Sequence, residues 1–345
     1  MSVSGVQSSS TDRGGQLKIY LANPRSFCAG VVRAIDVVRR AIQVYGRPVY
    51  VRHAIVHNQL VVDELTAAGA IFVEELSEVP AGSLVVFSAH GVSPAVRAEA
   101  RQRGLLVLDA TCPLVAKVHL EVARYARDGY HVILVGHREH VEVQGTFGEA
   151  PATISVVDSV EGVARLEVPD GPVAYVTQTT LSVDDTAEVV AALKQRWPGI
   201  REPAKADICY ATQNRQDAVK RLAARCRVIV VVSSRASSNG NRLAEVAWAR
   251  GCRSNLVEMA DEIRDDSLDG DVGITAAAST PEELVQACVR RIQWLVPGTA
   301  VQELSGKSEE HFFPLPESLL AAARGLGLDV GSGNARAAAR ASGNQ

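Results

Sequence analysis

The feature that most constrains this chain of 345 residues is a sequence module that occurs three times. Each copy has a cysteine at the start of a helical pattern, followed by two apolar, strand-like runs that end in polar residues. The three cysteines are Cys28, Cys112 and Cys209. Polar residues follow them at similar distances: His57, His140 and Ser238 lie 29, 28 and 29 residues later, and His90, Thr179 and Ser279 lie 62, 67 and 70 residues later.

The alternation of strands and helices predicts an α/β fold with small parallel sheets, whose ligands bind at the carboxyl ends of the strands. Three modules that face one another would bring the three cysteines together, surrounded by His, Ser, Thr and Asn side chains. The alternative is three unrelated α/β domains whose cysteines are buried core residues, because buried cysteine is common.

The chain is too long for one ordinary core, so several domains are expected. We expect three α/β modules between a disordered N-terminal arm and a disordered tail, with a C-terminal extension that packs back on the core. The expected ranges are 1–16 for the arm, 17–111, 112–208 and 209–293 for the modules, 294–324 for the extension and 325–345 for the tail.

Charge and hydropathy exclude some classes of partner. The formal net charge of −3 argues against a nucleic-acid or anionic-membrane surface. The longest aliphatic run, at 228–232, is too short to span a bilayer, and the first residues lack the apolar stretch of a secretory signal. We therefore expect a cytoplasmic protein whose six cysteines are thiols or metal ligands.

The cysteine spacing bears on the kind of metal site. No C-x-x-C is present, which disfavours zinc ribbons and ferredoxin-type loops. Three distant cysteines suit an iron–sulfur cluster with one iron that the protein does not hold, or a zinc ion with an open position. The remaining cysteines, Cys226, Cys252 and Cys288, are expected to be structural.

Two further segments carry polar groups after strands. Residues 136–146, GHREHVEVQGT, are expected to form a loop in which His140 and Glu142 can anchor a substrate and move a proton. His137, His140 and Glu142 could also form a zinc set, although no zinc-protease motif is present. Ser237, Ser238 and Asn239 precede a helical pattern, where hydroxyls, amides and free N–H groups suit phosphate oxygens or simply cap the helix.

Taken together, these segments resemble the 4-hydroxy-3-methylbut-2-enyl diphosphate reductase family, iron–sulfur oxidoreductases of the methylerythritol phosphate route to isoprenoids. The resemblance rests on ANPRSFCAGVVRAI, YVRHAIVHN, FSAHGVS, DATCPLVAKVH, GHREHVEVQGT, TQTTLSVDDT, DICYATQNRQ, SSNGNRLAE and TAAAST. It implies reductive dehydration of the hydroxymethylbutenyl diphosphate to isopentenyl and dimethylallyl diphosphate. It also implies three modules in pseudo-threefold arrangement around a central iron–sulfur site.

The resemblance implies roles for individual residues. Cys28, Cys112 and Cys209 would hold one [4Fe-4S] cluster per subunit, whose fourth iron binds the substrate hydroxyl. Glu142 would donate the proton that lets water leave, with Thr179 and His140 in its hydrogen-bond relay. The residues that would bind the diphosphate substrate are His57, His90, His140, Thr179, Ser237, Ser238, Asn239 and Ser279.

The resemblance also implies an external one-electron donor such as ferredoxin or flavodoxin, and a monomer or homodimer. Five positions depart from the usual family residues: Ser26, Val32, Val141, Gln144 and Ala277. These departures keep open a divergent paralogue with reduced or specialised activity. The site residues by themselves are also compatible with a zinc hydrolase and with a non-enzymatic three-module binding protein.

Overall fold

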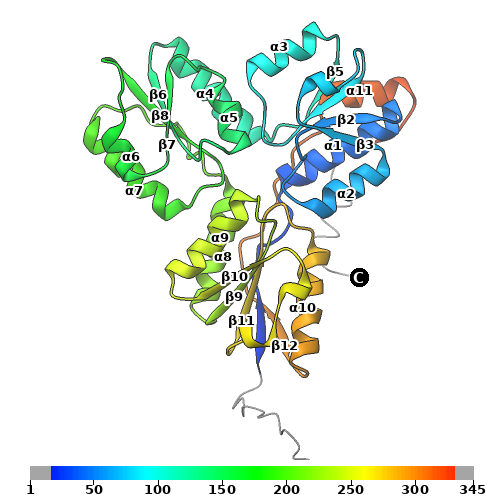
Figure 1. Ribbon diagram of the computed structural model, residues 1–345, viewed down its shortest axis with the longest axis vertical. Helices are drawn as coiled ribbons and strands as arrows, with labels where there is room; N and C mark the ends of the chain where they lie inside the picture. Colours follow the sequence, from blue (N-terminus) through cyan, green and yellow to red (C-terminus); the bar gives the residue numbers. More distant parts are fainter. Residues whose placement is uncertain (1–16, 331–345) are drawn as a thin grey trace, which may run out of the picture.

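The three modules form separate lobes around a common centre in this computed structural model, which describes residues 17–330 (Figure 1). The expected N-terminal arm, residues 1–16, lies outside the described residues, as does most of the expected tail, from residue 331 onward. Each lobe contains one sheet, and every strand pair in the three sheets is parallel. The predicted α/β class with small parallel sheets is confirmed.

Most strands are short and apolar, as expected for parallel sheets that are covered on both faces, whereas the edge strand at residues 300–303 is exposed. The first sheet has the order β3-β2-β4-β5, the second β7-β6-β8 and the third β10-β9-β11-β1-β12. In chain order the strands are β1 (Lys18–Leu21), β2 (Val49–Arg52), β3 (Ala70–Val73), β4 (Leu84–Phe87), β5 (Leu106–Asp109), β6 (His131–Val135), β7 (Ile154–Val157), β8 (Val173–Thr177), β9 (Val228–Val232), β10 (Arg253–Val257), β11 (Val272–Ala276) and β12 (Ala300–Glu303).

Helices cover both faces of each sheet, and each face has its own apolar core. No helix within residues 17–330 is long and apolar enough to cross a membrane. The α-helices are α1 (Ala29–Tyr45), α2 (Gln59–Ala68), α3 (Pro94–Gln102), α4 (Pro113–Arg127), α5 (Val141–Phe147), α6 (Val160–Arg165), α7 (Val183–Arg196), α8 (Tyr210–Ala223), α9 (Ser238–Ala249), α10 (Glu282–Leu295) and α11 (Glu317–Gly325). Short 3-10 turns cover Leu76–Glu78, Ala260–Glu262 and Asp265–Ser267.

The strand before each cysteine does not pair within the module that the cysteine begins. β1 precedes Cys28 but lies in the third sheet, between β11 and β12, where Figure 1 shows it as a blue strand in the lower lobe. The expected first module, 17–111, included β1 as its first strand. The apolar residues of β1 instead pack in a core of the third module. β5 precedes Cys112 and belongs to the first sheet. Before Cys209, a single β-bridge from Arg201 extends the second sheet.

Each of the three cysteines is hydrogen-bonded to the preceding module in the same way. The backbone N–H of Cys28 donates to the carbonyl of Ala278 at 3.2 Å, and that of Cys112 donates to Ala89 at 3.0 Å. The N–H of Cys209 donates to Thr179 at 3.1 Å. Each acceptor lies two residues beyond a strand of the preceding module: Ala278 after β11, Ala89 after β4 and Thr179 after β8. These bonds therefore close the modules into a ring.

The C-terminal extension connects the third module to the first. After β12 the chain crosses to the first lobe, where Leu319 and Ala323 of α11 are fully buried in the same apolar core as α1 (Figure 1). Residues 326–330, which we placed in a disordered tail, differ from that expectation: Leu328 N–H donates to the carbonyl of Ala323, and Val330 is buried in this core.

The fully buried Arg215 ties the extension to the cysteine segments. From α8 its guanidinium donates to the carbonyl of Ser26, two residues before Cys28, at 2.6 Å and to the carbonyl of Ala211 at 2.9 Å. It also pairs with Glu309 of the extension at 3.1 Å. One buried cation therefore holds three segments together: the turn before Cys28, the start of α8 and the C-terminal extension.

This network predicts the effect of Arg215→Met. Removing one partner of a buried ion pair leaves the other unpaired, so the free energy of unfolding should fall by about 3 kcal/mol in urea titrations. The matched control is Lys307→Met, which removes an exposed ion pair with Asp217 between the same extension and the same helix. The control should cost less than about 1 kcal/mol, and equal losses would contradict the role assigned to Arg215.

Candidate active site

The three cysteines cap the three helices that point toward the centre of the ring. Cys28 is the N-cap of α1, Cys112 of α4 and Cys209 of α8. Pro113 occupies the first position of α4, as its fixed backbone angle predicts. A helix N-terminus carries partial positive charge, which favours a thiolate at each of these positions.

Gly30 separates the sulfurs of two modules. A Cβ atom at this position would lie 2.7 Å from the Cys112 sulfur and 3.8 Å from the Cys28 sulfur, so glycine is required for the close approach. Burial and the neighbouring Cys28 raise the pKa of the Cys112 thiol to about 12. The same two causes raise the pKa of Cys209 to about 11.

These thiols fit an iron–sulfur cluster. With their raised pKa values, Cys112 and Cys209 are neutral thiols in the absence of a cation, whereas bound iron would supply the positive charge that ionises them. Within the described residues, no three His, Cys, Asp or Glu side chains are arranged to hold a single metal ion. The described residues therefore contain no assembled ligand set for a single zinc ion. The thiols of an iron–sulfur cluster each bind a different iron, so they need not converge on one atom.

The other three cysteines are buried in the apolar cores of the third module. Cys226 and Cys252 lie in one core, and Cys288 is fully buried in the other. Their burial in these cores agrees with the structural role that we predicted for them.

Three histidine rings come together from two modules. The ring centroids of His57 and His90 lie 4.3 Å apart, and His140 lies 5.5 Å from His57 and 6.0 Å from His90. The His57 Nε2 atom is buried and has no hydrogen-bond partner among the described residues. Since a buried polar atom is normally paired, this nitrogen is available to a ligand.

The histidines are neutral at physiological pH. Burial lowers the pKa of His57, lowers that of His90 strongly and lowers that of His140 to about 4. His140 is the N-cap of α5, and its Nδ1 accepts the backbone N–H of Glu142 at 3.2 Å. The hydrogen of neutral His140 is therefore on Nε2, which leaves this atom as a donor.

Glu142 is 3% exposed and makes both of its hydrogen bonds to Thr179. One carboxylate oxygen accepts the Thr179 backbone N–H at 2.7 Å, and the other accepts the Thr179 hydroxyl at 2.9 Å. Burial is the largest cause of the raised pKa of Glu142. The expectation of a loop at 136–146 is wrong in its second half, since Val141–Phe147 form α5 with Glu142 in the first turn.

The remaining predicted site residues lie at the module boundaries. Ser237 caps α9, and Ser238 accepts from Gln178 and Thr180 of the second module. Asn239 donates to Thr212 at 3.3 Å, and the Thr212 hydroxyl lies 3.2 Å from the Cys209 sulfur. The Ser279 hydroxyl donates to the carbonyl of His57 at 3.2 Å, which connects the third module to the first.

Three side chains of this network, Thr212, Gln178 and Thr180, are not among the residues predicted from the sequence. Thr212 and Gln178 are buried and connect predicted site residues to one another. Each lies within three residues of a predicted site residue, but their contacts cross module boundaries or helix turns and leave no trace in residue spacing.

Ser26 shows how a departure from the family pattern is accommodated. Its φ of +59° lies in the left-handed region, which glycine adopts at the least cost. Its hydroxyl donates to Glu282 at 2.7 Å, and this bond anchors the turn. Val141 is the first residue of α5 and Ala277 is fully buried, so both fit their positions without breaking an element.

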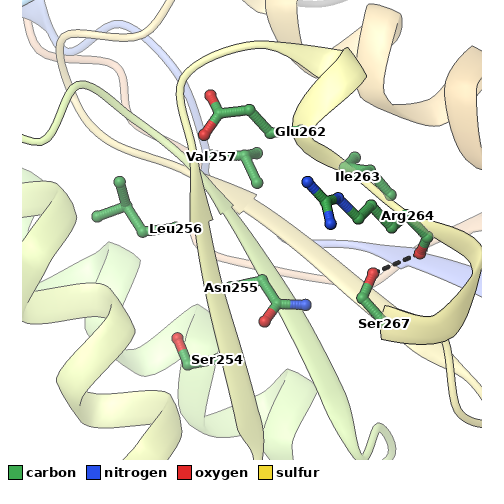
Figure 2. A pocket seen from close by; sticks show the side chains of 8 residues that line it. All are labelled: Ser254, Asn255, Leu256, Val257, Glu262, Ile263, Arg264 and Ser267. Atoms are coloured by element: carbon green, nitrogen blue, oxygen red, sulfur yellow. Dashed lines mark hydrogen bonds between the residues drawn. The ribbon is translucent and has the colours of Figure 1, made fainter.

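Neither of two further cavities is lined by a histidine of the cluster. His137 lines a cavity of about 70 Å³ together with Asp158 and Arg242. A cavity of about 370 Å³ lies between the edge strand β10 and residues 262–267, and it contains none of the predicted site residues (Figure 2).

The comparisons with known proteins agree with this geometry. The family model described as LytB protein matches residues 19–293. The chain belongs to the LytB protein family.

LytB relatives include proteins named 4-hydroxy-3-methylbut-2-enyl diphosphate reductase. The relative from Bordetella pertussis is 55% identical over 305 residues, which cover 88% of this chain and 94% of that protein. The relative from Hahella chejuensis is 56% identical over 310 residues, which cover 88% and 98%. The resemblance stated from the motifs is confirmed, and with it the oxidoreductase class.

A solved structure of a LytB relative extends the match to the fold. The E-1-hydroxy-2-methyl-but-2-enyl-4-diphosphate reductase from Plasmodium falciparum has a TM-score of 0.88 and 38% identity, covering 91% of this chain and all of that chain. A second structure, titled (E)-4-hydroxy-3-methyl-but-2-enyl diphosphate reductase, has a TM-score of 0.57 and 31% identity.

The low pKa of His140 predicts a pH-dependent difference between the wild-type chain and His140→Asn. As the pH falls from 6.5 toward 4, His140 binds a proton in the unfolded chain but not in the folded one. The free energy of unfolding therefore falls in this pH range. The asparagine oxygen can still accept the Glu142 N–H. Urea unfolding of the metal-free proteins should show that the wild type loses up to about 3 kcal/mol more than the variant. Parallel pH profiles would contradict the shift.

Proposed function

We infer that this chain is a 4-hydroxy-3-methylbut-2-enyl diphosphate reductase that holds a [4Fe-4S] cluster on Cys28, Cys112 and Cys209. The observation that carries the proposal is the closed ring of modules, which brings three helix-capping cysteines and three neutral histidines toward one centre. The names of relatives at about 55% identity support the reaction. In the overall reaction, two electrons and two protons convert the substrate into isopentenyl or dimethylallyl diphosphate and water.

The cysteines suit a cluster by their chemistry. Each thiol stands at a helix N-terminus, where the partial positive charge favours a thiolate, and all three cysteines are partly buried. When bound, the cluster supplies single electrons and an iron that no cysteine holds. The electrons would come from an external donor such as a ferredoxin or flavodoxin.

Glu142 and Thr179 are the proposed proton donor and relay. Burial raises the pKa of Glu142, so the carboxyl holds a proton more readily at neutral pH than an exposed one does. A protonated Glu142 can donate along its 2.9 Å contact to the Thr179 hydroxyl, which then passes its own hydrogen to the leaving hydroxyl of the substrate. His140 orients the first turn of this helix through its bond to the Glu142 N–H.

The diphosphate would be bound by neutral donors. His57, His90 and His140 offer ring N–H groups, and Ser237, Ser238, Asn239 and Ser279 lie at the carboxyl ends of strands in the third module. Hydrogen bonds to a charged acceptor are strong where water is excluded, so lysine and arginine are not required. Thr179 completes this set of substrate-binding residues.

The direct test of the proposal is chemical analysis of anaerobically purified protein followed by an assay with the hydroxymethylbutenyl diphosphate. We expect iron and sulfide in equal amounts, a brown chromophore and turnover with a one-electron donor. Stoichiometric zinc in a colourless protein would overturn the proposal. A cluster without turnover would instead support the divergent, specialised paralogue.

The assignment of the cysteines predicts opposite effects for two substitutions. Cys112→Ser should lose bound iron and sulfide, because it removes one of the three proposed ligands. Cys288→Ser, the matched control in the core of the third module, should retain both. The readout is iron and sulfide per folded chain. Equal loss in both variants would contradict the sorting of the thiols.

The role of Glu142 predicts a separation of binding from turnover in Glu142→Gln. The amide keeps the shape of the side chain but cannot donate a carboxyl proton, so kcat should fall by about 10²-fold or more. The dissociation constant of the substrate should change only a few-fold. A near-normal kcat, measured on protein with full cluster content, would remove Glu142 from the mechanism.

A further inference from the structure

Gln178 lies at the end of β8, between the second and third modules, and is 1% exposed. Its carbonyl oxygen accepts the backbone N–H of His137 at 3.1 Å. Its amide nitrogen lies 2.9 Å from the hydroxyl of Thr180 and 3.3 Å from that of Ser238. The two hydroxyls lie 3.0 Å from each other. These contacts form one connected network that begins in the segment before His140 and ends at the start of α9.

The orientation of the Gln178 amide follows from one group. A backbone N–H can only donate, so the oxygen of Gln178 must face His137 and the amide nitrogen must face the hydroxyls. Thr180 therefore accepts from Gln178. In the 3.0 Å contact between the two hydroxyls, Thr180 is the donor and Ser238 the acceptor. Since the Ser238 oxygen receives two donors, its own hydrogen is left for a partner outside the network.

We propose that Gln178 and Thr180 are positioning residues that orient the Ser238 hydroxyl as a hydrogen-bond donor to the diphosphate of the substrate. This inference rests on the proposed function, which assigns a diphosphate contact to Ser238. Phosphate oxygens only accept hydrogen bonds, so a serine whose hydrogen is held by a protein acceptor would present lone pairs to them and weaken binding. Ser238 is the first residue of the twelve-residue α9, whose free N–H groups favour an anion on the same side.

The sharpest test is Gln178→Glu, which preserves shape and reverses the network. A carboxylate accepts from His137, Thr180 and Ser238, so the hydrogen of Ser238 turns away from the ligand. The dissociation constant of the hydroxymethylbutenyl diphosphate, measured by calorimetry on the cluster-loaded enzyme, should rise about tenfold beyond the effect of the added charge. The contribution of charge alone is measured by making the same substitution in a Ser238→Ala background. There the rise in the dissociation constant should be about tenfold smaller.

A second pair of variants keeps the proposal testable if Gln178→Glu fails to fold. Thr180→Val removes the stronger donor to Ser238 and should weaken binding about threefold, whereas Thr180→Ser should restore the wild-type value because it keeps the hydroxyl. The kcat of both variants should stay within about twofold of wild type, since neither touches the proposed proton relay.

The outcomes separate this inference from the proposed function. If Ser238→Ala weakens binding but the Gln178 and Thr180 substitutions have the same effect with and without Ser238, the positioning role is overturned and the proposed function stands. If Ser238→Ala leaves binding of the diphosphate unchanged, the diphosphate contact in the proposed function is overturned, and the positioning role with it.

Discussion

The hydrogen bond from each cysteine N–H to the end of the preceding module is the contact on which the rest of the structure depends. Each module is joined to the next by a backbone hydrogen bond at a cysteine. The bonds run from Cys28 to Ala278, from Cys112 to Ala89 and from Cys209 to Thr179. β1 completes the cycle by joining the third sheet, so the first cysteine follows a strand of the last module. The thiols, the helix N-termini and the polar strand ends then share one centre as a geometric consequence.

The ring closes only because separate segments of the chain hold the third module against the first. The C-terminal extension buries α11 in the core of α1, and Arg215 binds the carbonyl of Ser26 and the carboxylate of Glu309. Ser26 itself adopts a left-handed conformation that its hydroxyl bond to Glu282 stabilises. The hydrogen bond to Glu282 therefore offsets the backbone strain of a left-handed serine next to the cysteine segment.

Burial controls the chemistry of the centre. The same loss of water raises the pKa of the Cys112 thiol and of Glu142, and lowers the pKa of His140. All of these groups are therefore more neutral than they would be in water, and a charged cofactor or substrate would supply the missing charge. Neutral donors with fixed orientation, such as His140 and the Gln178 network, suit a polyanion that arrives with its own charge.

Local patterns were sufficient to predict much of this protein. The repeated cysteine offsets, the apolar strand runs and the proline after Cys112 indicated three α/β modules with cysteines at helix starts, because these features depend on neighbours in sequence. The sequence could not indicate that β1 belongs to the third sheet, that Glu142 lies in a helix or that Arg215 reaches Ser26. The tertiary structure decided these points, because strand partners, burial and hydrogen bonds between modules arise from segments that only folding brings together.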